Sequence, residues 1–199
     1  MTDIALICGI DEAGRGPWAG PVTAAAVILD PARPIAGLTD SKKLSEKKRL
    51  ELEVEIKAKA ASWAVAHISC TDIDRINIRE ATFLAMTEAA RRLAFSPAHY
   101  LIDGNALPSG LPAPATAIVK GDMTEPAIAA ASILAKSERD RIMVDLCAKY
   151  PGYGFSQHKG YGTEAHAGAL ERLGPCPEHR LSFAPVRAAM NRLSSQPNL

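Results

Sequence analysis

The feature that most constrains the fold of this chain is the alternation of short apolar runs with longer helical patterns. Apolar runs of about four to eight residues are typical of buried strands, whereas longer segments with apolar positions three or four apart are typical of helices. Strands are expected at residues 4–10, 22–29, 63–68, 100–102 and 116–119, and helices at residues 44–60, 78–93, 126–150, 163–173 and 183–193. This order predicts an α/β fold with a mixed sheet flanked by helices and a C-terminal helical annex.

Local signals support several of these boundaries. The Gly- and Pro-rich residues 14–21 are expected to turn the first strand into a hairpin with the second. Ser45 is a candidate N-cap of the helix that follows it, and Pro126 suits the first turn of another helix. The small side chains of residues 129–132 predict that another element packs closely against that helix.

The 199 residues are enough for one domain, which we divide into a core of residues 1–150 and an annex of residues 151–199. We expect the annex to complete the substrate groove and its tail, from Ser194, to be disordered. No run of about 20 apolar residues predicts a membrane span. The N-terminal segment predicts a strand rather than a signal peptide. The four scattered cysteines favour a reducing cytoplasm over a disulfide framework or a zinc site.

The net charge of +1 argues against a protein that coats DNA nonspecifically. It does not exclude nucleic acid, because local patches matter more than the sum. Basic residues do gather at residues 42–49, 136–141, 158–159 and 179–180. Solvated helix faces are the competing explanation for these clusters.

Four acidic residues stand at the ends of predicted strands. Asp11 and Glu12 follow the first strand, and Asp103 and Asp122 follow the fourth and fifth. Ligands of open α/β sheets bind at strand ends, so these acids converge if the strands are neighbours. Clustered carboxylates need cations, and an oxygen-only set favours Mg²⁺ or Mn²⁺. Two such ions can drive phosphodiester hydrolysis. A turn or cap role is the competing explanation for any one of these acids.

A second pattern is the loop Gly14-Arg15-Gly16-Pro17, directly after Asp11 and Glu12. Glycines on both sides of an arginine let the backbone approach a ligand closely and leave its N–H groups free to donate. By itself such a pattern is weak, because most are turns. It is neither a Walker loop nor a dinucleotide-binding fingerprint.

Together with these residues, the whole chain resembles the bacterial type 2 ribonuclease H family (ribonuclease HII). The matching stretches run in register along nearly the full length: Gly9 to Pro17, Thr39 to Ser45, Ile102 to Asn105, Val119 to Asp122, Ala129 to Lys136, Arg139-Asp140, His158 to Thr163, and His179 to Phe183. The resemblance implies a ribonuclease H-like fold. It also implies an endonuclease that hydrolyses the RNA strand of RNA/DNA hybrids and cuts 5′ of ribonucleotides embedded in duplex DNA. Two-metal-ion hydrolysis would leave 3′-hydroxyl and 5′-phosphate ends.

The resemblance also implies roles for individual residues. Asp11, Glu12, Asp103 and Asp122 match the family's metal-binding acids. Gly14, Arg15 and Gly16 match the loop that reads the ribose 2′-hydroxyl, and Tyr161 matches the tyrosine that abuts the sugar beyond the RNA–DNA junction. Phosphate contacts are expected from Ser41, Lys42, Lys43, Lys136 and Arg180.

Three residues near these motifs could have either a functional or a structural role. His158 and His179 could assist the leaving group or tune metal exchange, although a hydrogen-bonded structural role is the commoner one. Asp140 lies within a predicted helix, where ion pairing is common, so we leave it out of the catalytic set.

Other functions stay open at this point. A 3′–5′ exonuclease of the same superfamily would also use carboxylates and two metals, but the Gly-Arg-Gly loop favours ribose recognition. A noncatalytic nucleic-acid-binding module is disfavoured because acids repel phosphate, and a phosphate-binding metabolic enzyme has only the glycine-rich turn in its favour. We expect a monomer, with docking on a replication clamp as an open alternative.

Overall fold

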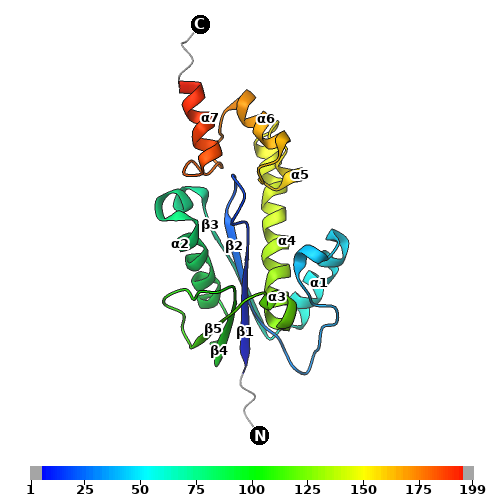
Figure 1. Cartoon of the computed structure of the whole chain (residues 1–199). Coiled ribbons are helices and arrows are strands. Elements are labelled where there is room, and N and C mark those ends of the chain that lie inside the picture. The colour runs from blue at the N-terminus through cyan, green and yellow to red at the C-terminus, as the bar shows by residue number, and fades with distance from the viewer. Residues whose placement is uncertain (1–5, 195–199) are drawn as a thin grey trace.

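Five strands form one mixed sheet in the computed structural model, which describes residues 6–194 (Figure 1). The strands are β1 (Ile7–Ala13), β2 (Val22–Ile28), β3 (Ser62–Ile68), β4 (His99–Asp103) and β5 (Ala115–Ile118). Their spatial order is β3-β2-β1-β4-β5. β2 pairs antiparallel with β1 and β3, whereas β1, β4 and β5 run parallel. The expected mixed α/β sheet and the hairpin between its first two strands are therefore confirmed.

Helices cover both faces of this sheet. The longer ones are α1 (Glu46–Lys59), α2 (Cys70–Arg91), α4 (Pro126–Lys149), α6 (Glu164–Leu173) and α7 (Ala184–Ser194). Three short ones are the 3-10 helix η1 (Ser41–Lys43), α3 (Gly121–Thr124) and α5 (Phe155–His158). Figure 1 shows α2 on one side of the sheet and α1 and α4 on the other. The C-terminal helices α5 to α7 lie beyond the C-terminal end of β1.

Alternate residues of the central strands supply two apolar cores. Cys8 and Ile10 of β1 face α2, in a core that also contains Met86. Ala25 and Val27 of β2 face α1 and α4 and pack against residues 130–135 of α4. The close packing expected from the small side chains of that segment is confirmed.

Glycine at position 9 brings the start of α4 directly onto β1. A Cβ at Gly9 would overlap the backbone of Ala127 and Ile128. The contact places the first turn of α4 beside the middle of β1, two residues before Asp11. The helix that carries much of the candidate site is thereby held against the strand that carries its first acids.

The observed boundaries confirm some local signals and correct others. Ser45 caps α1 by accepting a hydrogen bond from the Lys48 N–H, and Pro126 occupies the first turn of α4. β1 continues through Asp11 and Glu12, which lie inside the strand rather than after it, because both residues pair with β2. α2 begins at Cys70, well before the expected residue 78, and is broken at Asn77 (φ 67°, ψ 164°). None of the three short helices was expected.

Two expectations about the ends of the chain have different outcomes. α7 reaches Ser194, the first residue of the tail that was expected to be disordered, and the rest of that tail lies outside the described residues. Of the strand expected at residues 4–10, residues 4 and 5 also lie outside them, and β1 begins at Ile7. Within residues 6–194, no helix has the length and apolar character needed to cross a membrane. The four cysteines are unpaired, as their spacing predicted.

Candidate active site

The four predicted acids converge where the parallel strands end. Asp11 and Glu12 lie in the last three residues of β1, and Asp103 is the last residue of the neighbouring strand β4. Asp122 lies in α3, which follows β5. The Asp103 carboxylate accepts a hydrogen bond from the Gly121 N–H (2.8 Å), so it fastens α3 to the end of β4. The sheet topology thus gathers acids from three separate segments of the chain.

Burial and mutual repulsion disfavour the charged forms of these acids. The pKa of Asp11 is raised well above its usual range, first by burial and then by the charges of Glu12 and Asp103. Burial is also the main cause that raises the pKa of Glu12, although nearby Arg15 opposes it. The pKa of Asp122 is raised by burial, then by the charges of Asp40 and Asp103. Such a cluster of like charges calls for a cation.

Asp40 is a member of this acidic cluster that the sequence reasoning did not assign. Its carboxylate caps η1 by accepting from the Lys42 N–H (2.9 Å), and it lies close enough to Asp122 to raise the pKa of that carboxyl. The sequence gives no sign of its place in the acidic cluster, because an N-cap role already explains an Asp before a short helix. Asp40 brings η1, with Ser41 and Lys42, to the edge of the acidic cluster.

The donor set of this cluster fits a divalent metal. All candidate ligands are carboxylate oxygens, which suit Mg²⁺ and Mn²⁺ better than zinc. Among residues 6–194, no three Asp, Glu, His or Cys side chains already form an ion-holding group. Binding would therefore require the repelling carboxylates to turn toward a shared centre, which a cation favours by removing their repulsion.

A cavity of about 420 Å³ adjoins the acids on the α4 side of the sheet. Besides the predicted acid Glu12, it contains most of the residues predicted to bind substrate: Gly14, Arg15, Gly16, Ser41, Lys42, Lys136 and Tyr161. Arg15 is more than half exposed and pairs with Glu12 (3.6 Å). Lys43 is exposed nearby, with its ammonium 3.6 Å from the Met123 sulfur. Arg49, Ser132 and Arg139, which also line the cavity, were not among the predicted residues.

Arg180 is the predicted phosphate contact that the structure contradicts. Its side chain is completely buried and donates hydrogen bonds to three backbone carbonyls, those of Gly14 (2.6 Å), Arg15 (2.9 Å) and Gly20 (2.9 and 3.0 Å). A guanidinium committed to these acceptors has no surface to offer a phosphate. Arg180 instead holds the Gly-Arg-Gly loop from behind, and its basic character concealed this role in the sequence.

Arg139 supports the same turn from α4. This buried side chain donates to the carbonyls of Ala19 (3.1 Å), Pro21 (3.1 Å) and Lys159 (2.9 Å). Burial lowers the pKa of Arg139 to about 10 and that of Arg180 to about 9, and the repulsion from Arg139 contributes to the latter. Two neighbouring buried cations thus donate their hydrogen bonds to backbone carbonyl oxygens.

The two glycines of the loop have different surroundings. Gly14 adopts a left-handed conformation (φ 94°), and a Cβ there would overlap the Arg139 side chain. At Gly16 a Cβ would meet only the Tyr161 ring, at an ordinary 3.6 Å. Gly14 is therefore required by the fold of the loop, whereas Gly16 leaves space open in the cavity.

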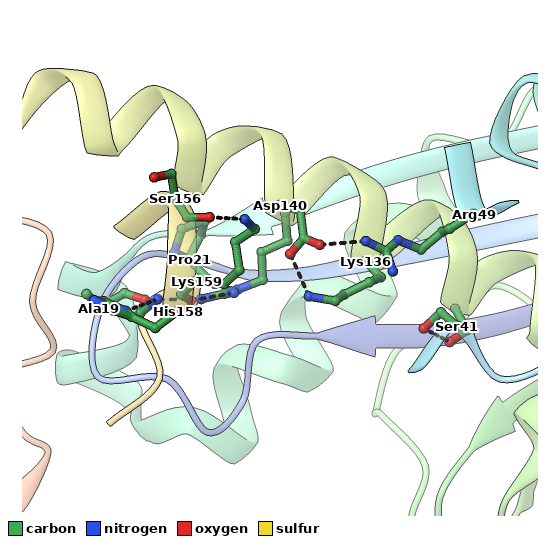
Figure 2. Close-up of polar contacts among 12 residues, drawn as sticks. Ala19, Pro21, Ser41, Arg49, Lys136, Asp140, Ser156, His158 and Lys159 are labelled. Carbon is green, nitrogen blue, oxygen red and sulfur yellow. Dashed lines mark hydrogen bonds and ion pairs between the residues drawn. The ribbon is translucent and has the colours of Figure 1, made fainter. Parts of the chain in front are cut away.

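Several residues that line this cavity make polar contacts with one another or with Asp140 (Figure 2). Asp140 accepts from Arg49 (2.9 Å) and from Lys136 (2.6 Å), which confirms the ion pairing expected of it. The hydroxyls of Ser41 and Ser132 are hydrogen bonded to each other (2.8 Å). Lys136 therefore reaches the cavity already paired with Asp140, and Ser41 is nearly buried.

The polar atoms of His158 and His179 are all used within the fold. His158 donates to the Tyr153 carbonyl (2.8 Å) and accepts from the Gly160 N–H (3.2 Å). His179 accepts from the Cys176 N–H (3.0 Å) and contacts the His166 Nε2 (3.0 Å). These hydrogen bonds favour a structural role for both histidines.

A chain of hydrogen bonds leads from these histidines to Tyr161. Because the Tyr161 carbonyl can only accept, His166 Nδ1 donates to it (3.0 Å). Because the Nδ1 of His179 accepts from the Cys176 N–H, its Nε2 carries the proton and donates to the Nε2 of His166, so both rings are neutral. Burial and the neighbouring His166 lower the pKa of His179 to about 4, which agrees with this assignment. His166, which the sequence reasoning missed, thus holds the backbone of Tyr161.

Comparison with known proteins identifies related sequences over almost the entire chain. The family model described as ribonuclease HII matches residues 8–186. The ribonuclease HII of Hyphomonas neptunium is 62% identical, over 96% of this chain and 99% of that protein. The ribonuclease HII of Halorhodospira halophila is 59% identical, over 91% of this chain and 93% of that protein.

Solved structures with the same fold come from the same group of enzymes. The ribonuclease H2 of Pyrococcus horikoshii OT3 has a TM-score of 0.82 at 25% identity, over 96% of this chain and all of that one. The ribonuclease HII in the complex with PCNA from Archaeoglobus fulgidus has a TM-score of 0.76 at 29% identity, over 89% of this chain and 95% of that one. Bst-RNase HIII in complex with Mn²⁺ shares the fold with a TM-score of 0.71 at 20% identity, over 96% and 71%.

Proposed function

The chain belongs to the ribonuclease HII family, and from this premise we propose how its site cleaves RNA in RNA/DNA hybrids and at ribonucleotides embedded in DNA. The enzyme is an endoribonuclease. Asp11, Glu12, Asp103 and Asp122 are its proposed catalytic acids. The observation that carries this proposal is their convergence at the end of β1, β4 and β5, with pKa values of three of them raised by burial and mutual repulsion.

The acids imply a divalent metal, and we propose two Mg²⁺ or Mn²⁺ ions held by these four residues. When bound, such ions would neutralise the carboxylates and supply the activation of water and the stabilisation of the leaving oxygen that phosphodiester hydrolysis needs. Asp103 serves two purposes here. Its Oδ1 accepts from the Gly121 N–H, which keeps Asp122 at the site while the other oxygen stays available.

We further propose that the loop Gly14-Arg15-Gly16 reads the ribose 2′-hydroxyl. A backbone loop suits this task because its polar groups are fixed and need no rotamer ordering. The carbonyls of Gly14 and Arg15 accept from buried Arg180, so the loop is rigid before substrate arrives. Arg15 is exposed and can bind the adjacent phosphate through charge-assisted hydrogen bonds.

Tyr161 is the proposed sensor of the RNA–DNA junction. Its exposed ring lies beside Gly16, and would press against the sugar that follows the ribonucleotide. A deoxyribose at that position lacks the hydroxyl that would crowd the ring. The proposed cut is therefore on the 5′ side of a ribonucleotide followed by DNA, and leaves a 3′-hydroxyl and a 5′-phosphate.

The basic residues around the cavity complete the proposed substrate groove. Lys42, Lys43, Lys136 and Ser41 are the proposed phosphate contacts, and the hydroxyl of Ser41 is bonded to that of Ser132 on α4. The proposed division assigns residues 1–150 to the catalytic core. It assigns the C-terminal annex to closing the groove with Tyr161.

We also propose a partner, an oligomeric state and a location for this chain. The Archaeoglobus fulgidus relative was solved in complex with PCNA, so docking on a replication clamp is a reasonable proposal for this chain. A monomeric state and a cytoplasmic location complete the proposal. The unpaired cysteines suit that compartment.

The experiment that tests the proposed function uses an end-blocked duplex with one embedded ribonucleotide. We expect a single cut 5′ of the ribonucleotide with Mg²⁺ or Mn²⁺, and none with excess EDTA. Ca²⁺ should bind but support little turnover, because its larger and looser coordination shell positions the attacking water poorly. Full activity in EDTA would contradict the metal assignment, and a cut on the 3′ side would contradict the role of the loop.

A further inference from the structure

A second, smaller cavity borders the acids on the α2 side of the sheet. It has a volume of about 80 Å³ and shares Glu12 and Arg15 with the larger cavity. Its other lining residues are Arg79, Thr82, Phe83 and Met86 of α2 and Asp103, Gly104, Asn105 and Ala106 at the end of β4. We propose that this cavity, with Arg79 at its rim, binds the sugar-phosphate backbone of the cleaved strand on the 5′ side of the cut. The proposal rests on the proposed function.

The positions of the two cavities give the strand a direction. The larger one contains the Gly-Arg-Gly loop and Tyr161, which take the ribonucleotide and the nucleotide after it. Both of these nucleotides lie 3′ of the cut. A strand that passes over the acids from the α4 side therefore continues onto the α2 side with its 5′ part. The small cavity is the concave surface that adjoins Glu12 and Asp103 there.

Arg79 has the free guanidinium that a backbone phosphate requires. The residue is exposed, and its Cζ lies 5.3 Å from the centre of the Phe83 ring. Among the described residues its guanidinium makes no hydrogen bond or ion pair, whereas Arg75 on the same helix pairs with Asp72 (2.8 Å). The ring supports the flat face of the guanidinium and leaves the N–H fork free, which is the geometry for bidentate phosphate binding.

The break in α2 makes the side chain, rather than the helix end, the anion-binding group. Asn77 adopts a left-handed φ of 67° and starts a new helical segment. Its side-chain oxygen accepts from the N–H groups of Arg79 (3.0 Å) and Glu80 (3.1 Å). These backbone donors are already used. A phosphate at this position would therefore be bound by the Arg79 guanidinium.

The size of the cavity suits a group of the sugar-phosphate backbone. A volume of about 80 Å³ corresponds to roughly three water molecules at about 30 Å³ each. That space suits a phosphate group or the edge of a sugar. The contact is therefore expected to be independent of the base sequence, as phosphate contacts usually are.

The test compares Arg79→Ala with Arg75→Ala, an exposed arginine of the same helix outside the cavity. With the single-ribonucleotide duplex we expect Arg79→Ala to raise KM about fivefold, the upper range for one exposed charge pair, with kcat nearly unchanged. The slope of log affinity against log salt should fall by about one. Arg75→Ala should match the wild type in both, and Arg79→Lys should recover part of the loss.

Neutral linkages locate the contact on the strand. A methylphosphonate at one of the first two linkages 5′ of the scissile phosphate should weaken wild-type binding and cause no further loss in Arg79→Ala. Equal KM values for Arg79→Ala and Arg75→Ala would overturn the inference, as would a loss in Arg79→Ala that depends on linkages 3′ of the cut. If the wild type did not cut 5′ of the ribonucleotide, the proposed function itself would fail, and cut mapping detects that separately.

Discussion

The acids at the end of β1 and the arginines beneath the turn that follows are both buried charges, yet their surroundings are opposite. Around Asp11 the nearest charges are those of Glu12 and Asp103, which repel it. Around Arg180 the guanidinium donates to three backbone carbonyls, and these hydrogen bonds hold it despite the repulsion from Arg139. One region is frustrated without a ligand, whereas the other is satisfied by the fold alone.

The difference separates two ways of building a functional site. Buried like charges destabilise the folded chain and create affinity for a cation, so the acidic cluster functions by binding a ligand that the fold does not supply. A buried cation whose hydrogen bonds are all made rigidifies the backbone around it, so the arginine pair functions by holding the Gly-Arg-Gly loop and the turn that follows in place. Substitutions in the two regions should therefore affect activity and stability in opposite proportions, and five substitutions with four expected effects test this.

The largest expected effect is the loss of cleavage in Asp122→Asn. Removing one carboxylate should lower the rate by more than about 10³-fold, equivalent to about 4 kcal/mol of transition-state stabilisation. The pKa of Asp122 is raised above its ordinary 3.8 by burial and by Asp40 and Asp103. The folded state therefore loses stability as pH rises from about 3.8 through the raised pKa, and at neutral pH the substitution removes this cost.

The measurements are cleavage rate and thermal unfolding at pH 7 in EDTA. The melting temperature of Asp122→Asn should equal or exceed that of the wild type, and saturating Mg²⁺ should stabilise the wild type more. Asp145→Asn, at an exposed position of α4, is the matched control and should change neither quantity. A strongly destabilised Asp122→Asn protein would show that Asp122 is a structural cap.

The second effect should appear in stability. Arg180→Ala leaves the carbonyls of Gly14, Arg15 and Gly20 without their donor in a buried place, so we expect unfolding to become easier by about 3 kcal/mol. Urea unfolding measures this, with exposed Arg187→Ala as the control. If Arg180→Ala kept wild-type stability while the slope of log affinity against log salt fell by about one, Arg180 would be a direct phosphate contact after all.

A third, smaller effect distinguishes the two glycines of the loop. Gly14→Ala places a side chain in a left-handed conformation and against Arg139, which should cost about 2 kcal/mol of stability. Gly16→Ala puts its methyl group into the cavity beside Tyr161, so the fold should be retained and cleavage should fall. Unfolding and cleavage assays on both variants make the comparison, and equal stability losses would show that both glycines serve the fold.

Sequence patterns predicted the parts of the molecule that depend on near neighbours in the chain. The cap at Ser45, the first turn of α4 at Pro126 and the ion pairing of Asp140, which Lys136 supplies from one turn earlier, each involve residues within one helical turn. The acids could also be located, because a polar residue that ends an apolar run is visible without any knowledge of partners.

Patterns failed where a residue is determined by distant parts of the chain. Arg180 bonds to Gly14 across 166 positions, so its basic character indicated a surface contact and gave no sign of burial. The beginning of α2 was missed because Asn77 interrupts the helix with a left-handed residue, and the segment before it lacked a clear apolar pattern. Asp40 was overlooked because only the tertiary fold brings it to Asp122.

Tyr161 joins the two regions, and its substitution is the smallest of the four expected effects. Its backbone belongs to the satisfied region through the hydrogen bond from His166, whereas its ring is 45% exposed beside Gly16 in the cavity. Tyr161→Ala should therefore leave stability nearly unchanged. It should lower cleavage at an RNA–DNA junction by more than about 10-fold, equivalent to about 1.4 kcal/mol. Tyr161→Phe, the matched control, keeps the ring and should retain most of the activity.

Single-turnover cleavage of two duplexes separates sugar sensing from general packing. One duplex has a single embedded ribonucleotide, and the other has a continuous RNA strand without a junction. Because the ring is proposed to favour a deoxyribose after the ribonucleotide, Tyr161→Ala should lose more on the first duplex than on the second. If the variant cuts the single ribonucleotide at the wild-type rate and position, Tyr161 is a packing residue. Junction recognition would then have to come from the Gly-Arg-Gly loop alone.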